Sequence, residues 1–284
     1  MDELIRREND RVLTLLSGFL NGDARAITAE AVTSLAAACG LSPEEAYEAL
    51  LIAWLEQTPE DAALLRRYLP RMVKRVDASL VREDAYCRAI GSVRAEEGHF
   101  SLTTGEIAPM ELFVRDDFLQ AADGRIYPQL GWFDEKVTFP AVRENGRDWM
   151  TVTPNEINTM RACLRETRGH VVTYGLGLGY YAFHALLSGD VTSVTVVERS
   201  AEVIRLFERH LLPRFPRPEC LRIVHADAFD HMRDVLPRVP CDTVFADLWH
   251  DVSDGLPLYR RLKALETPGP RYLYWIEPTL RCYL

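Results

Sequence analysis

The chain has 284 residues, of which 48% are hydrophobic and 26% are charged, and its formal net charge is −9 at pH 7. This length and apolar content predict a large core and two domains. No apolar stretch reaches membrane-spanning length and the charged start is unlike a signal peptide, so we expect a cytoplasmic protein without membrane association. The negative charge argues against nucleic acid as a partner.

The six cysteines are scattered without any C-x-x-C pair, which is typical of buried thiols in a reducing compartment. The seven histidines show no metal-ligand spacing. We therefore expect no metal site.

Residues 1–98 are predicted to form a helical domain, because apolar residues recur there at helical spacing. Ser42-Pro-Glu-Glu and Thr58-Pro-Glu-Asp are strong helix starts, each with a capping hydroxyl, a proline and two acids in the first turn. We expect the second of these helices to end near Pro70. The expected helices cover residues 4–19, 31–38, 42–56, 58–68 and 78–94.

Residues 99–153 are predicted to form a small antiparallel β module, because the periodicity shortens and turn signals separate short apolar runs. Asn145-Gly146 is a good hairpin turn. A helix capped at Thr153 then leads into a third region, residues 154–284.

The third region opens with a strand, His170 to Tyr174, that runs directly into alternate glycines and then an apolar helical segment. The chain would turn sharply beneath a ligand here. A side chain at Gly175 or Gly177 would hold the backbone away from that ligand. The following helix would aim its unpaired N–H groups at the same ligand. This strand, loop and helix are typical of a nucleotide-binding unit.

Three further predicted strands end on or just before a carboxylate, at Glu198, Asp227 and Asp247. The carboxyl ends of neighbouring parallel strands are where open α/β sheets bind ligands. A fifth strand is expected over residues 271–277, after a helix over 257–265. The fold class that we predict is α/β, with a Rossmann-like, mostly parallel, doubly wound sheet.

From about residue 155 the chain resembles the class I S-adenosylmethionine-dependent methyltransferases, and more distantly their spermidine-synthase branch. The resemblance is carried by Gly175-Leu-Gly-Leu-Gly179, Glu198, Asp227-Ala-Phe and Phe245-Ala-Asp-Leu. It implies S-adenosylmethionine as cofactor, with the glycines near the methionine moiety, Glu198 on the ribose, Asp227 at the adenine and Asp247 beside the sulfonium. The implied cofactor-binding residues are Tyr174, Gly175, Gly177, Gly179, Glu198, Asp227, Ala228 and Asp247.

Other nucleotide-binding classes fit less well. A nicotinamide dehydrogenase would have G-x-G-x-x-G, but Tyr180 stands where its third glycine is needed. A P-loop would need Gly-Lys-Ser/Thr after the glycines, and the chain lacks it.

The best candidates for work on an acceptor are Asp247, His250 and Asp251, in the loop after the fourth strand. Methyl transfer from a sulfonium has an excellent leaving group, so few catalytic side chains are needed beyond a carboxylate or imidazole that orients or deprotonates the acceptor. Structural alternatives stay open, since Glu198 and Asp227 can each cap the following helix, and His250 and Asp251 can be loop residues.

The family normally adds a helix and two strands after its fifth strand, and here only seven residues follow Glu277. The sheet is thus expected to be shortened at its C-terminal edge, which the β module, a second subunit or nothing would cover; an open edge favours a homodimer. We expect methyl transfer to a small-molecule or protein acceptor. The alternatives are a non-catalytic cofactor-binding or scaffold protein, and an aminopropyltransferase in which Asp247 and Asp251 hold a polycationic amine.

Overall fold

The structure, a computed structural model, describes residues 3–284 and divides into two compact units. The first unit comprises the chain up to Val81 together with Glu106–Thr138, and the second comprises Arg82–Gly105 and Phe139–Leu284. The chain therefore crosses between the units three times, whereas the expected regions followed one another with boundaries at residues 98 and 153. No helix within residues 3–284 is long and apolar enough to cross a bilayer.

The first unit combines helices with a three-stranded sheet. Ser42 and Thr58 each cap a helix through a reciprocal capping box, as predicted. Tyr47 stacks on Trp132 in the core, with ring centroids 4.7 Å apart. The helices are α1 (Glu3–Gly22), α2 (Ala29–Cys39), α3 (Pro43–Leu55) and α4 (Pro59–Met72), and the sheet has the order β1 (Val73–Arg75), β5 (Ile126–Trp132), β4 (Phe113–Gln120).

Helix α4 ends at Met72, close to the expected end near Pro70, and the proline lies in its last turn. One helix prediction in the N-terminal region was wrong. The helix expected over residues 78–94 is instead two short ones, α5 (Ser79–Arg82) and α6 (Ala85–Ile90). Asp84 separates them, because its carboxylate accepts a hydrogen bond from the Cys87 N–H and so starts a new helix.

The strands expected in one β module belong to two different sheets. Strands β4 and β5 lie in the first unit, and the others form a four-stranded sheet, most of it in the second unit. The predicted Asn145-Gly146 hairpin turn is confirmed, with φ of 51° and 79° at these residues. The order of the second sheet is β2 (Ala95–Glu97), β3 (Phe100–Ile107), β6 (Val137–Glu144), β7 (Arg147–Thr151).

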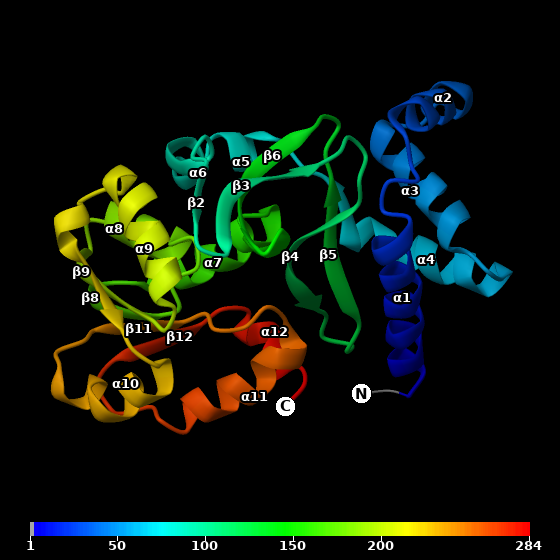
Figure 1. Cartoon of the computed structure of the whole chain (residues 1–284). Coiled ribbons are helices and arrows are strands. Elements are labelled where there is room, and N and C mark those ends of the chain that lie inside the picture. Colours follow the sequence, from blue (N-terminus) through cyan, green and yellow to red (C-terminus); the bar gives the residue numbers. More distant parts are fainter. Residues whose placement is uncertain (1–2) are drawn as a thin grey trace. The chain divides into compact units, whose positions relative to one another are not determined.

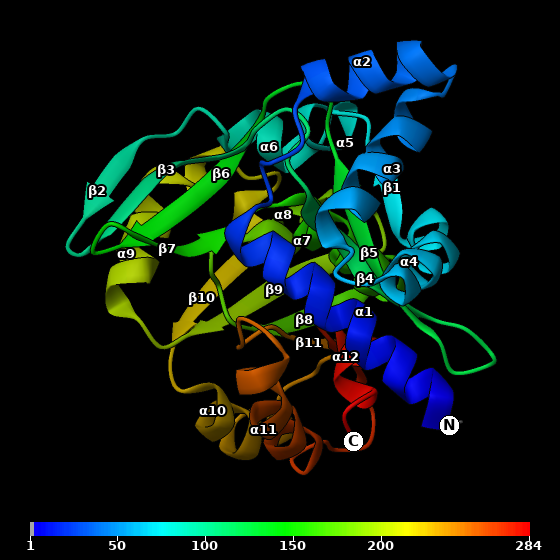
Figure 2. The same ribbon diagram turned by 90° about the vertical axis from the view of Figure 1, so that its right-hand side faces the viewer.

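A five-stranded parallel sheet forms the centre of the second unit, so the chain is a mixed α/β protein as predicted (Figure 1). Its strands are rich in buried valines because helices cover both faces. The order is β10 (Leu221–His225), β9 (Val191–Glu198), β8 (Gly169–Tyr174), β11 (Thr243–Ala246), β12 (Arg271–Tyr274). Helices α7 (Pro154–Glu166), α8 (Tyr180–Leu187) and α9 (Ala201–His210) lie on one face, and α10 (Ala228–Asp234) and α11 (Val252–Lys263) lie on the other (Figures 1 and 2).

Strand β12 forms one edge of this sheet, and within residues 3–284 it pairs with β11 alone. The β module therefore does not cover the edge. The strand is shorter than expected because Ile276, with φ of 46°, turns the chain into α12 (Glu277–Arg281). Helix α11 begins five residues before its expected start because Asp251 caps it. Three short 3₁₀ turns complete the unit: η1 (Leu212–Arg214), η2 (Pro218–Cys220) and η3 (Leu236–Arg238).

All six cysteines are free thiols. The expectation that they are buried was wrong, because Cys39 and Cys282 are exposed and the other four are partly exposed.

Candidate functional site

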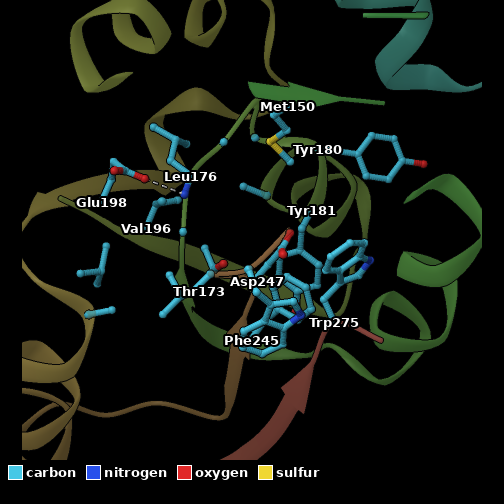
Figure 3. Close-up of a pocket in the computed structure, with 18 of the residues that line it drawn as sticks. Met150, Thr173, Leu176, Tyr180, Tyr181, Val196, Glu198, Phe245, Asp247 and Trp275 are labelled. Carbon is cyan, nitrogen blue, oxygen red and sulfur yellow. Dashed lines mark hydrogen bonds between the residues drawn. The ribbon is translucent and has the colours of Figure 1, made fainter. Parts of the chain in front are cut away.

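A pocket of about 480 Å³ lies at the carboxyl ends of β8, β9, β10 and β11, wholly within the second unit. Figure 3 shows its walls: the glycine loop and Glu198 on one side, and Asp247 with several aromatic rings on the other. The strand ends thus meet where open α/β sheets place their ligand sites.

The glycine loop has left-handed backbone at Gly175, Gly177 and Gly179, with φ of 96°, 49° and 79°. A side chain at these positions would collide with the protein itself: with the Asp247 carbonyl oxygen at Gly175, the Met150 sulfur at Gly177 and the Phe207 ring at Gly179. We expected the glycines at 175 and 177 to leave room for a ligand. The structure shows that they leave room for neighbouring segments of the chain and that both also line the pocket, while their contact with a ligand stays a prediction.

Distant segments fix the far end of this loop. The Tyr86 hydroxyl of α6 donates to the Leu178 carbonyl oxygen at 2.6 Å, and the Leu178 N–H donates to the Met150 sulfur of β7 at 3.2 Å. Tyr86 is fully buried and its ring packs edge-on against Phe183 and Phe215. The loop is therefore shaped by α6 and β7, which lie outside the region in which its motif occurs.

Glu198 is 8% exposed and connects the end of β9 to the glycine loop. Its Oε2 accepts from the Leu176 N–H at 3.1 Å (Figure 3). Its Oε1 accepts from the Ser200 N–H at 2.7 Å. The cap of α9 is Ser200, whose Oγ accepts from the Val203 N–H. Glu198 thus lies on the pocket wall where the sequence predicts it, bonded to the loop.

Asp227 and Ala228 also line the pocket. The Asp227 carboxylate caps α10, accepting from the Phe229 and Asp230 N–H groups at 2.9 Å and 3.1 Å. The capping alternative therefore describes what Asp227 does in this structure. Tyr174, in contrast, does not line the described pocket; its ring is fully buried and its hydroxyl lies 3.2 Å from Nδ1 of His231.

Asp247 follows β11 directly, held by its N–H, which donates to the Tyr174 carbonyl oxygen at 3.0 Å. Burial raises the pKa of its carboxyl to about 7, against a smaller lowering by His250. Glu156, at the start of α7, lines the same pocket, and burial followed by the charge of Asp247 raises its pKa to about 8. Both carboxyl groups therefore line the same pocket.

His250 and Asp251 are not brought to Asp247 as a cluster. The His250 side chain is 70% exposed at the pocket rim, and its Nδ1 lies 3.1 Å from Asp254 Oδ2. Asp251 caps α11, accepting from the Ser253 hydroxyl and the Ser253 N–H, and these two bonds lower its pKa; it does not line the described pocket. Of the three expected catalytic residues, only Asp247 faces the pocket interior (Figure 3).

Aromatic side chains form the rest of the second wall. Tyr181 stacks on Phe245 with ring centroids 3.8 Å apart, and Trp275 donates from Nε1 to Thr159 Oγ1 at 2.9 Å. Trp249 is 5% exposed, and its indole N–H has no hydrogen-bond partner in the described chain. These rings make a large share of the pocket apolar, as is common in small-molecule sites.

Sequence reasoning missed Glu156, Met150 and Trp275 as pocket residues. Glu156 was visible only as part of the helix start at Thr153, and its side chain does accept from the Thr153 N–H at 3.1 Å. Met150 lies in β7 and Trp275 directly follows β12, and no sequence motif covers either position. Among residues 3–284, no group of three or more His, Cys, Asp or Glu side chains is arranged to hold a metal ion.

Comparison with known proteins adds little to this geometry. No family model matches the chain, and no curated protein matches it. A solved structure that it resembles is precorrin 8W decarboxylase of Methanobacterium thermoautotrophicum, with 20% identity and a TM-score of 0.31. The likeness covers 43% of this chain and 63% of that one, so the chain spans less than two thirds of its length. A likeness this weak carries no argument about function.

Proposed function

We propose that the protein is an S-adenosylmethionine-dependent methyltransferase whose second unit contains a Rossmann-like cofactor domain. The observation that carries the proposal is the pocket at the carboxyl edge of the parallel sheet, where a glycine loop, the buried Glu198 and Asp247 come together. These are three of the four motifs on which the resemblance to class I methyltransferases rests.

The residues present fit the cofactor. The N-terminus of α8, beside the glycine loop, would hold its methionine end, since the unpaired N–H groups of a first helical turn favour a carboxylate. Glu198 would hold the ribose hydroxyls, since each of its oxygens accepts one hydrogen bond within the described chain and can accept another. Ala228 and Phe229 would border the adenine. When bound, the cofactor supplies an activated methyl group.

The chain's own residues would orient the acceptor, exclude water and receive a proton. The aromatic wall keeps the reacting atoms away from solvent, which strengthens electrostatic interactions in the pocket. Asp247 has a pKa near 7, so its carboxyl can exchange a proton with an acceptor near neutral pH.

Isothermal titration calorimetry of the purified protein tests the proposal. We expect micromolar binding of S-adenosylmethionine and S-adenosylhomocysteine, and no binding of NAD, which serves as the control nucleotide. Preference for decarboxylated S-adenosylmethionine would replace methyl transfer by aminopropyl transfer. Absence of binding to all four ligands would overturn the proposal and favour a scaffold protein.

The aminopropyltransferase alternative relied on Asp247 and Asp251 as a pair that holds a polycationic amine. Asp251 instead caps α11 outside the described pocket, so the structure gives this pair no support.

A further inference from the structure

The sulfur of Met150 lies against the glycine loop. Met150 belongs to β7, and its Sδ accepts the Leu178 N–H at 3.2 Å. A Cβ built on Gly177 would lie 2.0 Å from the same sulfur, so the sulfur already touches the loop backbone. Figure 3 shows the side chain reaching from β7 toward the loop. The thioether therefore helps to hold the loop in its present shape.

Exposure sets Met150 apart from the other methionines among residues 3–284. Met150 is partly exposed and lines the pocket, whereas the others are at most 6% exposed. Those buried side chains are Met72, Met110, Met160 and Met232. A small oxidant that enters the pocket therefore reaches Met150 ahead of the others.

The cysteines do not offer the same connection to the loop. Peroxide attacks thiols as well as thioethers, but none of the six cysteines lines the described pocket. Among the sulfur atoms of the described chain, that of Met150 is the one bonded to the glycine loop.

Peroxide converts a methionine thioether into a sulfoxide, which is polar and larger. A lone pair of the sulfur attacks one peroxide oxygen, the O–O bond breaks, and the second oxygen leaves as water after a proton transfer. The sulfur is thereby oxidised by two electrons and the peroxide is reduced. The added oxygen finds no free space on the loop side, because the sulfur is already in contact with Gly177 and the Leu178 N–H. Either the loop or β7 must shift.

We infer that Met150 is an oxidation site for hydrogen peroxide, and that its sulfoxide displaces the glycine loop and weakens cofactor binding. The effect on the cofactor rests on the methyltransferase function proposed above. Methionine sulfoxide reductases reverse this modification, so the pocket would alternate between a form that binds tightly and a form that binds weakly.

The first test is the rate at which hydrogen peroxide oxidises each methionine of the wild-type protein, followed by mass spectrometry of its peptides. We expect Met150 to react several times faster than the four buried methionines. Bound S-adenosylmethionine should slow the reaction at Met150, which lines the pocket. A rate at Met150 no higher than at Met160 would overturn the inference.

Amide hydrogen exchange reports on the loop without any cofactor. After peroxide treatment, the Leu178 N–H should exchange faster, since its acceptor has changed and the loop has moved. Peroxide should cause no such change in Met150→Leu. The matched control is Met160→Leu, which removes a buried pocket methionine and should keep the response.

The Met150→Leu variant keeps all six cysteines, so a peroxide effect on the loop that persists in it would belong to a thiol and overturn the inference. Unchanged or slower exchange of the Leu178 N–H in the oxidised wild type would also overturn it.

Calorimetry separates failure of this inference from failure of the proposed function. In the wild type, oxidation should raise the Kd of S-adenosylmethionine about tenfold, the effect of losing one hydrogen bond in the pocket wall. Peroxide should leave the Kd of Met150→Leu at its own starting value. If the untreated protein binds no cofactor, the methyltransferase proposal fails, and the oxidation rates and amide exchange still decide the site. If it binds and oxidation leaves Kd unchanged, the proposal stands and the inference is wrong.

Discussion

The two walls of the pocket are built differently. The wall with the glycine loop comes from one continuous stretch, in which β8, the loop, α8 and β9 follow each other and Glu198 ends the last strand. The other wall is assembled from separate parts of the chain, since its lining residues Glu156, Asp247 and Trp275 come from α7, the end of β11 and the residue after β12. A continuous wall leaves a motif in the sequence, whereas an assembled wall exists only once the sheet has formed.

Replacing Asp247 by asparagine should have the largest effect on the assembled wall. If its carboxyl receives the acceptor's proton, methyl transfer should slow by about 10²-fold or more, since general-base contributions have that size. The Kd of S-adenosylmethionine, measured by calorimetry, should change little. Turnover equal to wild type would remove Asp247 from the mechanism.

Replacing Gly175 by alanine tests how tightly the continuous wall is fixed. The new methyl group would meet the Asp247 carbonyl oxygen, and φ there is 96°. We expect a loss of roughly 2–4 kcal/mol in the free energy of unfolding, measured with urea.

The control is Gly146→Ala, where φ is 79° but nothing lies within 4 Å of the added atom. It should cost only about 1 kcal/mol, the price of the left-handed backbone alone. Equal losses of unfolding free energy in the two variants would mean that the contact with the Asp247 carbonyl oxygen adds nothing to the cost of the Gly175 substitution.

The carboxyl groups of Glu156 and Asp247 should make stability depend on pH. Burial raises the pKa of Asp247 to about 7 and of Glu156 to about 8. Between their ordinary pKa values and these raised ones, the folded protein therefore binds more protons than the unfolded chain. The free energy of unfolding should then fall as pH rises from about 4 to about 8. Each pKa unit is worth about 1.4 kcal/mol, and because both residues keep some solvent exposure we expect a total fall on the order of 2–4 kcal/mol.

Other titratable groups face the pair: Tyr86 and Cys87 from α6, Cys163 from α7 and His250 from the loop after β11. The free energy of unfolding should be measured with urea at several pH values for the wild type and for the double variant Glu156→Gln/Asp247→Asn, which keeps the other titratable groups. We expect this free energy to vary less with pH in the double variant. An equal pH dependence in both proteins would assign the titration to other groups.

Tyr86→Phe should have the smallest effect, and it tests whether α6 helps to shape the glycine loop. It removes the hydrogen bond to the Leu178 carbonyl oxygen and keeps the ring contacts. We expect a loss of about 1 kcal/mol in unfolding free energy, together with a few-fold rise in the Kd of S-adenosylmethionine. Tyr283→Phe, at an exposed tyrosine, is the control, and a Kd unchanged in both would limit Tyr86 to a stabilising role.

Local signals predicted those parts of the fold that depend on local physics. The helix starts at Ser42 and Thr58 and the turn at Asn145-Gly146 follow from capping and backbone preferences. The parallel sheet follows from buried strands that alternate with helices. These features need no knowledge of distant contacts.

The rest depends on pairing across the chain. Nothing near residues 111–139 indicates that β4 and β5 join β1, since strand partners are chosen by tertiary packing. Glu156 carries only a capping signal, and Asp251 satisfies the cap of α11, which a single sequence cannot distinguish from catalysis. S-adenosylmethionine binding by Glu198 and Asp227 stays a prediction.

The bond from Tyr86 to Leu178 also has a consequence for the order of folding. It joins residues 92 positions apart, so the glycine loop reaches its final shape only after a long stretch of chain has closed. Closing such a loop is slow compared with forming β8 or α8. The pocket should therefore be among the last features to mature as the protein folds, after the sheet beneath it is already in place.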